Sequence, residues 1–67
     1  MSVTVEEVLA AVAAIRESQN DPEKAHSLED KLHHAVLRSI ATDPSNASAL
    51  AQAALTTEAL DFERWCA

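Results

Sequence analysis

The sequence contains no glycine and no tyrosine, and it has a single cysteine among its 67 residues. Without glycine, the chain cannot form the glycine-rich loops that cradle phosphates or the sharp turns that present a catalytic serine. Cys66 cannot form an internal disulfide, and its place beside the C-terminal residue suits a preorganised nucleophile poorly. We therefore expect no catalytic residue, no cofactor and no enzymatic activity.

Basic residues are also scarce: five face eleven acidic residues, and the formal net charge is −6. Scattered basic residues do not form the continuous patch that nucleic acids or anionic membranes require, which disfavours both as partners. No segment resembles a signal peptide or a membrane span, so we expect a cytoplasmic protein. Basic surfaces of other proteins remain compatible with this charge.

Alanine is the commonest of the hydrophobic residues, which make up 48% of the chain, and it has the highest helix propensity. Two Asp-Pro pairs, at 21–22 and 43–44, interrupt the helical pattern. The sequence therefore predicts one all-α domain, residues 1–67: a compact bundle of three helices plus a short C-terminal helical segment.

Local signals indicate where each helix begins. Thr4 and Glu7 form a capping-box pattern that predicts a helix from about Val5 to residue 17, and Val3 with Val8 matches a hydrophobic staple. The apolar stripe of this helix consists of Val5, Val8, Leu9, Val12 and Ile15.

A second helix is predicted from about Pro22 to Ala41, capped by Asp21. Ser27 with Asp30 is a rival capping pair, so a kink near Ser27 is an alternative. The predicted apolar stripe consists of Leu28, Leu32, Val36 and Ile40.

The third helix follows Pro44, with Asp43 or Asn46 as its cap. Its expected buried side consists of Leu50, Ala53, Ala54 and Leu55. Phe62 and Trp65, three residues apart, are predicted to close one end of the core.

The stretch HSLEDKLHH, residues 26–34, contains all three histidines. His26 with Asp30, and Asp30 with His34, have the spacing that lets two ligands on one helix meet a metal ion, but no other helix offers a histidine. A structural role is favoured, with Glu29 and His33 beside the apolar stripe and Asp30 and His34 turned towards solvent.

Glu29 needs a partner at the margin of a core, and several candidates are open. Arg64, Arg16 or Lys24 could form an ion pair with it, or the Trp65 indole could donate a hydrogen bond. A third interpretation of the region is a protein-binding patch, for which the candidate residues are Glu29, Asp30, His33, His34, Asp61, Arg64 and Trp65.

Two stretches, HSLEDKLHHAVLRSIA and ALTTEALDFERWCA, together resemble small uncharacterised proteins of actinobacteria and of the phages that infect them. The shared features are an acidic pair followed by leucine and an aromatic, then VLxxIA, and a terminal DFxRW. His33 stands where an aromatic is expected, which implies packing for that residue. The matching residues are Glu29, Asp30, Leu32, Val36, Leu37, Ile40, Ala41, Asp61, Phe62, Arg64 and Trp65. The resemblance implies a phage or prophage origin.

These observations together predict a small acidic protein-interaction module, monomeric or weakly homodimeric. A phage-encoded binder or inhibitor of a host protein is the expected function. One alternative is a nucleic-acid mimic that occupies a basic groove of its target. Another is a metal-binding protein that uses the cluster from His26 to His34.

Overall fold

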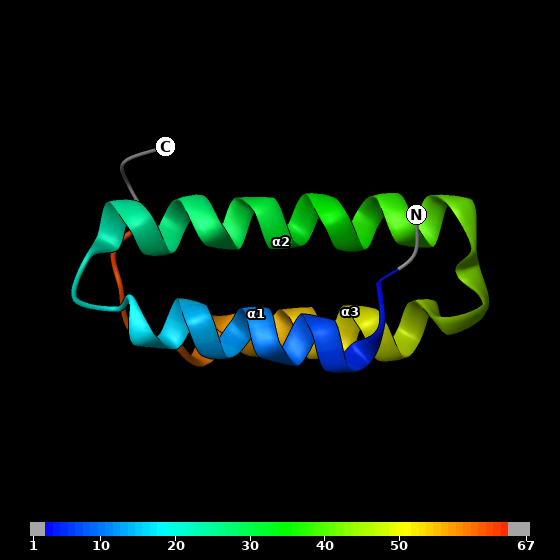
Figure 1. Ribbon diagram of the computed structural model, residues 1–67, viewed down its shortest axis with the longest axis horizontal. Helices are drawn as coiled ribbons and strands as arrows, with labels where there is room; N and C mark the ends of the chain where they lie inside the picture. The colour runs from blue at the N-terminus through cyan, green and yellow to red at the C-terminus, as the bar shows by residue number, and fades with distance from the viewer. Residues whose placement is uncertain (1–2, 65–67) are drawn as a thin grey trace.

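The computed structural model describes residues 3–64 and consists of three α-helices (Figure 1). They are α1 (Val5–Glu17), α2 (Pro22–Thr42) and α3 (Ala47–Leu55). The molecule measures 35 × 20 × 16 Å. The predicted all-α bundle is confirmed. Within residues 3–64, no helix has both the length and the apolar character needed to cross a membrane.

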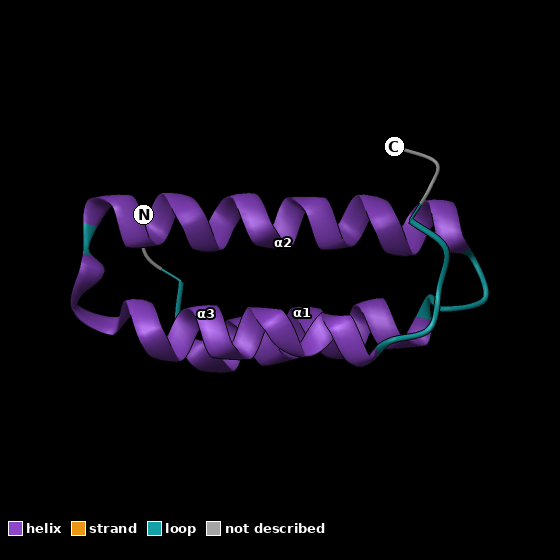
Figure 2. Ribbon diagram, turned by 180° about the vertical axis from the view of Figure 1, so that it is seen from behind, coloured by secondary structure: helices purple, strands orange, loops and turns teal. Residues whose placement is uncertain are grey.

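The longest helix, α2, packs against both of the others. Figures 1 and 2 show α1 and α3 side by side, running in the same direction, with α2 antiparallel to both. Residues 60–64 then cross one end of the bundle towards the start of α2 (Figure 2). Two segments far apart in the sequence, the tail and the first turns of α2, thereby meet.

The N-terminus of α1 has the capping box that the sequence predicted. The Thr4 hydroxyl accepts a hydrogen bond from the Glu7 N–H at 3.1 Å, and the Thr4 N–H donates to Glu7 Oε1 at 2.9 Å. Val3 is half-buried against the core, as a hydrophobic staple requires. These contacts satisfy two backbone N–H groups at the start of α1 and fix the entry of the chain.

The turns between helices form without glycine, and no residue within 3–64 has a positive φ angle. Asp21 caps α2 by accepting from the Lys24 N–H at 3.3 Å. Asp43 accepts from Ser45 and caps a single 3-10 turn, η1 (Pro44–Asn46), that leads into α3. Asn46 makes no side-chain capping bond.

Helix α2 is continuous through Ser27, so the alternative of a kink there is wrong, and it ends at Thr42. Its buried residues alternate at spacings of four and three: Ala25, Glu29, Leu32, Val36 and Ser39. Leu28 and Ile40, which we predicted to be central, are only partly buried. The inward face of α2 is therefore rotated relative to the predicted apolar stripe, and Glu29 lies on it.

One prediction for α3 is wrong, because Leu55 is 54% exposed. After Leu55 the chain tightens into a second 3-10 turn, η2 (Thr56–Ala59), and Thr57 takes the inward position with 0% exposure. Phe62 is buried at the end of the core, as predicted, while Trp65 lies outside the described residues. The core consists of Val8, Val12, Ile15, Ala25, Leu32, Val36, Leu50, Ala53, Ala54, Leu60 and Phe62.

Removing the α1 cap should measurably destabilise the bundle. Thr4→Ala should lower the free energy of unfolding by about 1 kcal/mol, because the Glu7 N–H loses its acceptor. Urea unfolding followed by circular dichroism measures the change. Glu6→Ala is the control, since Glu6 lies in the same turn without a capping bond, and an equal loss in both variants would contradict the role of the cap.

Candidate functional site

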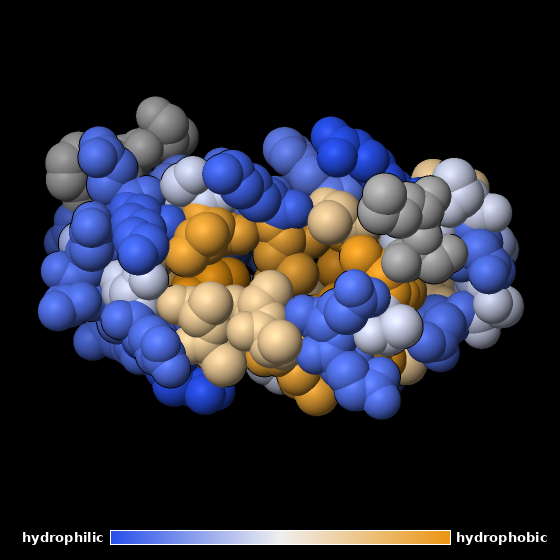
Figure 3. Space-filling model, in the orientation of Figure 1, coloured by the Kyte–Doolittle hydropathy of each residue, from blue (hydrophilic) through white to orange (hydrophobic). Residues whose placement is uncertain are grey.

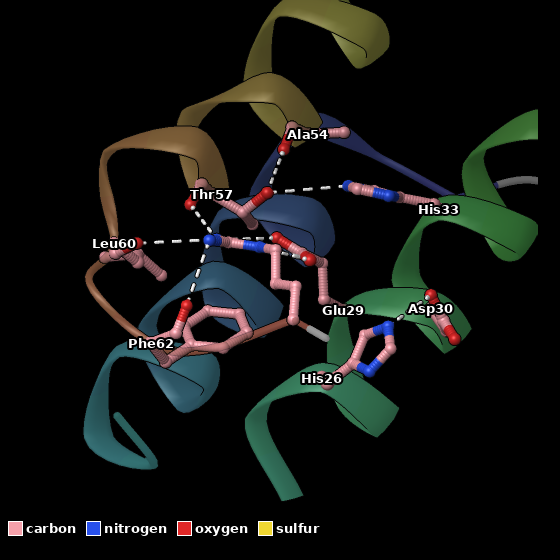
Figure 4. Close-up of polar contacts among 9 residues, drawn as sticks. His26, Glu29, Asp30, His33, Ala54, Thr57, Leu60 and Phe62 are labelled. Atoms are coloured by element: carbon pink, nitrogen blue, oxygen red, sulfur yellow. Dashed lines mark hydrogen bonds and ion pairs between the residues drawn. The ribbon is translucent and has the colours of Figure 1, made fainter. Parts of the chain in front are cut away.

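Polar side chains meet at the end of the bundle where the tail crosses α2 (Figure 4). Helix α2 supplies Glu29 and His33, η2 supplies Thr57, and the tail supplies Arg64. The tail reaches α2 because Leu60, with an extended backbone, ends the 3-10 turn and both Leu60 and Phe62 are buried. Apolar burial of the tail thus positions Arg64.

Arg64 binds the carboxylate of Glu29 in a two-point ion pair. Arg64 Nε donates to Oε1 at 2.9 Å and Nη2 donates to Oε2 at 3.1 Å. The Glu29 side chain is 8% exposed and that of Arg64 is 37% exposed. This parallel arrangement is the strongest geometry available to an arginine and a carboxylate. Among the described candidates Arg64, Arg16 and Lys24, it identifies Arg64 as the partner of Glu29.

The same guanidinium also holds the irregular backbone of the tail. Arg64 donates to the carbonyl oxygen of Thr57 at 2.9 Å and to those of Phe62 and Leu60 at 3.3 and 3.4 Å. Its central carbon lies 3.9 Å from the centre of the Phe62 ring, a cation–π contact. Arg64 therefore adds a donor to the Thr57 carbonyl, which already accepts the Leu60 N–H, and it links η2, the tail and α2.

Thr57 extends this network on its far side. Its hydroxyl donates to the Ala54 carbonyl oxygen at 3.2 Å and lies 3.5 Å from His33 Nε2, a long contact. Sequence reasoning missed Thr57. Its position seven residues after Leu50, in helical phase with Ala53 and Ala54, was the available signal.

Two opposing effects act on the pKa of Glu29. Burial raises it, whereas the hydrogen bonds and the positive charge of Arg64 lower it, and the net pKa is below the ordinary value of 4.5. The pKa of Arg64 is raised, mainly by its hydrogen bonds with Glu29. The pair is therefore ionised at neutral pH, and its geometry is that of a structural clamp.

The other residues of the predicted patch are less closely connected. His26 Nε2 lies 3.6 Å from Asp30 Oδ1, and Asp30, His34 and Asp61 are exposed. Trp65 lies outside the described residues. Among residues 3–64, no three histidine or carboxylate side chains come together as metal ligands would.

Two apolar grooves lie along α2, and sequence reasoning identified neither. The α1–α2 groove has a volume of about 290 Å³, and it is visible as the apolar hollow in Figure 3. The α2–α3 groove has a volume of about 270 Å³, and it is bordered by Leu37 and Leu55, which are 63% and 54% exposed. The α1–α2 groove is lined by Val3, Glu7, Val8, Ala11, Ala14, Leu28, Lys31, Leu32 and Ala35.

No protein-family model, no curated protein and no solved structure matches this chain. The features of the molecule that bear on its function are the clamp, the two grooves and the charges around them.

Removing Arg64 from the clamp should destabilise the fold more than removing Glu29. Arg64→Ala leaves a buried carboxylate without its partner and should cost about 2 kcal/mol of unfolding free energy. Glu29→Met replaces the carboxylate with an apolar side chain and should cost less, because Arg64 can turn to water. Chemical denaturation measures both, with Arg16→Ala as an exposed control. Equal costs would show that Glu29 is not desolvated.

The clamp should also make stability depend on pH below the ordinary pKa of Glu29. Because the folded pKa lies below 4.5, its contribution is complete above 4.5 and is lost as the pH falls through the folded pKa. The decline in unfolding free energy as the pH falls below about 4.5 should be shallower in Glu29→Gln than in the native sequence. Urea titrations at each pH measure this free energy. Equal declines in the two proteins would show that Glu29 does not make stability depend on pH.

Proposed function

We propose that this chain is a protein-interaction module that binds its partner in the α1–α2 groove. The observation that supports this is the apolar floor of the groove, which no residue within 3–64 covers. An open apolar surface of this kind costs solvation free energy unless a partner occupies it. The small size of the chain and its lack of glycine loops agree with binding rather than catalysis.

The chemistry of the groove favours a protein over a small molecule. Sites for small ligands combine apolar walls with several convergent polar groups that orient the ligand. Here the floor is aliphatic, and among residues 3–64 Glu7 and Lys31 are the only charged residues that line the groove. Such a groove can select a large apolar side chain on a partner, but it offers little to orient a small polar molecule.

The resemblance of the C-terminal two thirds to small proteins of actinobacteria and their phages suggests a host protein as the partner. A phage-encoded binder or inhibitor is the corresponding biological role. The candidate patch around Glu29 stays a separate prediction: Asp30, His34 and Asp61 are accessible, whereas Glu29 is engaged by Arg64.

Filling the groove should abolish binding without unfolding the protein. Ala14 is exposed and lines the groove, so Ala14→Arg should place a long charged side chain in it at little cost in stability. Affinity capture from the native host, followed by mass spectrometry, would show which proteins bind the native chain and which bind Ala14→Arg.

The matched control is Ala10→Arg, one helical turn away on α1, exposed and outside the groove lining. A partner captured by the native chain and by Ala10→Arg, but not by Ala14→Arg, supports the proposal. Equal thermal unfolding of the two variants establishes that both fold. A partner retained by Ala14→Arg would refute the use of this groove.

A further inference from the structure

The two charged residues that line the α1–α2 groove differ in their engagement. The carboxylate of Glu7 accepts the Thr4 N–H and so belongs to the α1 cap. Within residues 3–64, the ammonium group of Lys31 makes no hydrogen bond or ion pair. The α2 side of the groove therefore carries a positive charge that no ion pair within residues 3–64 neutralises, although the chain as a whole carries −6.

Lys31 belongs to a row of basic residues along α2. Lys24 and Arg38 stand seven residues before and after it, and all three are exposed. Positions seven apart lie on nearly the same side of a helix, so these residues form one edge of α2, and Lys31 places that edge beside the groove. Hydrophilic side chains border the apolar hollow along α2 in Figure 3. We name this row the basic edge.

Charge is segregated across α2. The helical phase puts Glu23 and Asp30 on the opposite edge, towards α3. The α2–α3 groove differs from the α1–α2 groove, because no Asp, Glu, Lys or Arg of the described part of the chain lines it. Three of the five basic residues of the chain thus lie on the single edge that borders the α1–α2 groove.

The opposite wall of the groove includes two small side chains. They are Ala11 and Ala14 of α1. Ala35 of α2, which also lines the groove, is small as well and fills little of the space between the two helices. A furrow between two antiparallel helices with small residues on one wall accommodates a third helix, whose ridge of side chains fits between them. The basic edge, from Lys24 to Arg38, spans about 21 Å, or about four turns of such a helix.

We propose that the α1–α2 groove binds an amphipathic helix of a partner protein whose apolar ridge is flanked on one side by acidic residues facing Lys24, Lys31 and Arg38. This inference rests on the proposed use of the same groove, and it adds the secondary structure and charge of the occupant. Acidic residues at seven-residue spacing would stay in register with the basic edge along the whole contact. A partner with basic residues there would be repelled, which provides specificity.

Designed helical peptides test the proposal on the full chain. Each has leucine at the two apolar heptad positions, and one flank carries Glu in the first peptide, Gln in the second and Lys in the third. Fluorescence anisotropy at low salt should show the Glu peptide binding about tenfold more tightly than the Lys peptide. Raising the salt concentration should narrow this difference.

Variants of the protein assign the effect to the basic edge. Lys31→Glu should weaken binding of the Glu peptide about tenfold and strengthen binding of the Lys peptide. Arg16→Glu makes the same charge change at an exposed position outside the groove lining and should leave the preference intact. Because both sites are exposed, thermal unfolding should change little in either variant.

Several outcomes would overturn this proposal. They are equal affinity for the Glu and Lys peptides, absence of binding by all three peptides, and equal effects of Lys31→Glu and Arg16→Glu. A dimer in light scattering that Ala14→Arg dissociates would show that a second copy occupies the groove, which also overturns it. If the native partner is still lost in Ala14→Arg while the peptides show no preference, the binding function stands and the acidic-helix inference fails.

Discussion

Burial of the Glu29 carboxylate is the constraint on which the end of the bundle depends. On α2 it occupies the inward face together with Ala25, Leu32 and Val36, where an unpaired charge would cost several kcal/mol. The two hydrogen bonds from Arg64 compensate for this cost, and they require the tail to fold back across the bundle. Because Arg64 also holds the carbonyl groups of the tail, the charge pair and the closure of the core are one interaction.

Small side chains explain why the bundle keeps open grooves on both sides of α2. Alanine stabilises each helix but fills little of the space between two of them, and alanines line both the α1–α2 and the α2–α3 groove. The buried core is therefore narrow, with α2 as the wall common to both grooves. The same alanine-rich composition that favours helix leaves apolar surface for a partner. The basic edge of α2 adds positive charge to one side of the α1–α2 groove.

Local patterns predicted the helices well because their signals act over four or five residues. The capping box at Thr4 and the Asp-Pro pairs determined where α1, α2 and η1 begin. Predictions that depended on which side of a helix faces the core were less accurate. Leu55 proved exposed and Thr57 buried, because helical phase groups Thr57 with the buried side of α3 and turns Leu55 away from it.

In the candidate site, too, local sequence patterns identified residues but did not determine how they pack. The sequence identified Glu29 and its possible partners, but helical phase alone could not choose between Arg64, Arg16, Lys24 and Trp65. That choice depends on the path of the tail, which Leu60 and Phe62 determine by being buried. The sequence by itself determined the all-α class, the helix starts and the acidic charge, since each follows from residue chemistry over short distances. Only the tertiary structure decided the Glu29–Arg64 clamp, the two grooves and the position of the basic edge, because each requires helices that are distant in sequence to be packed together.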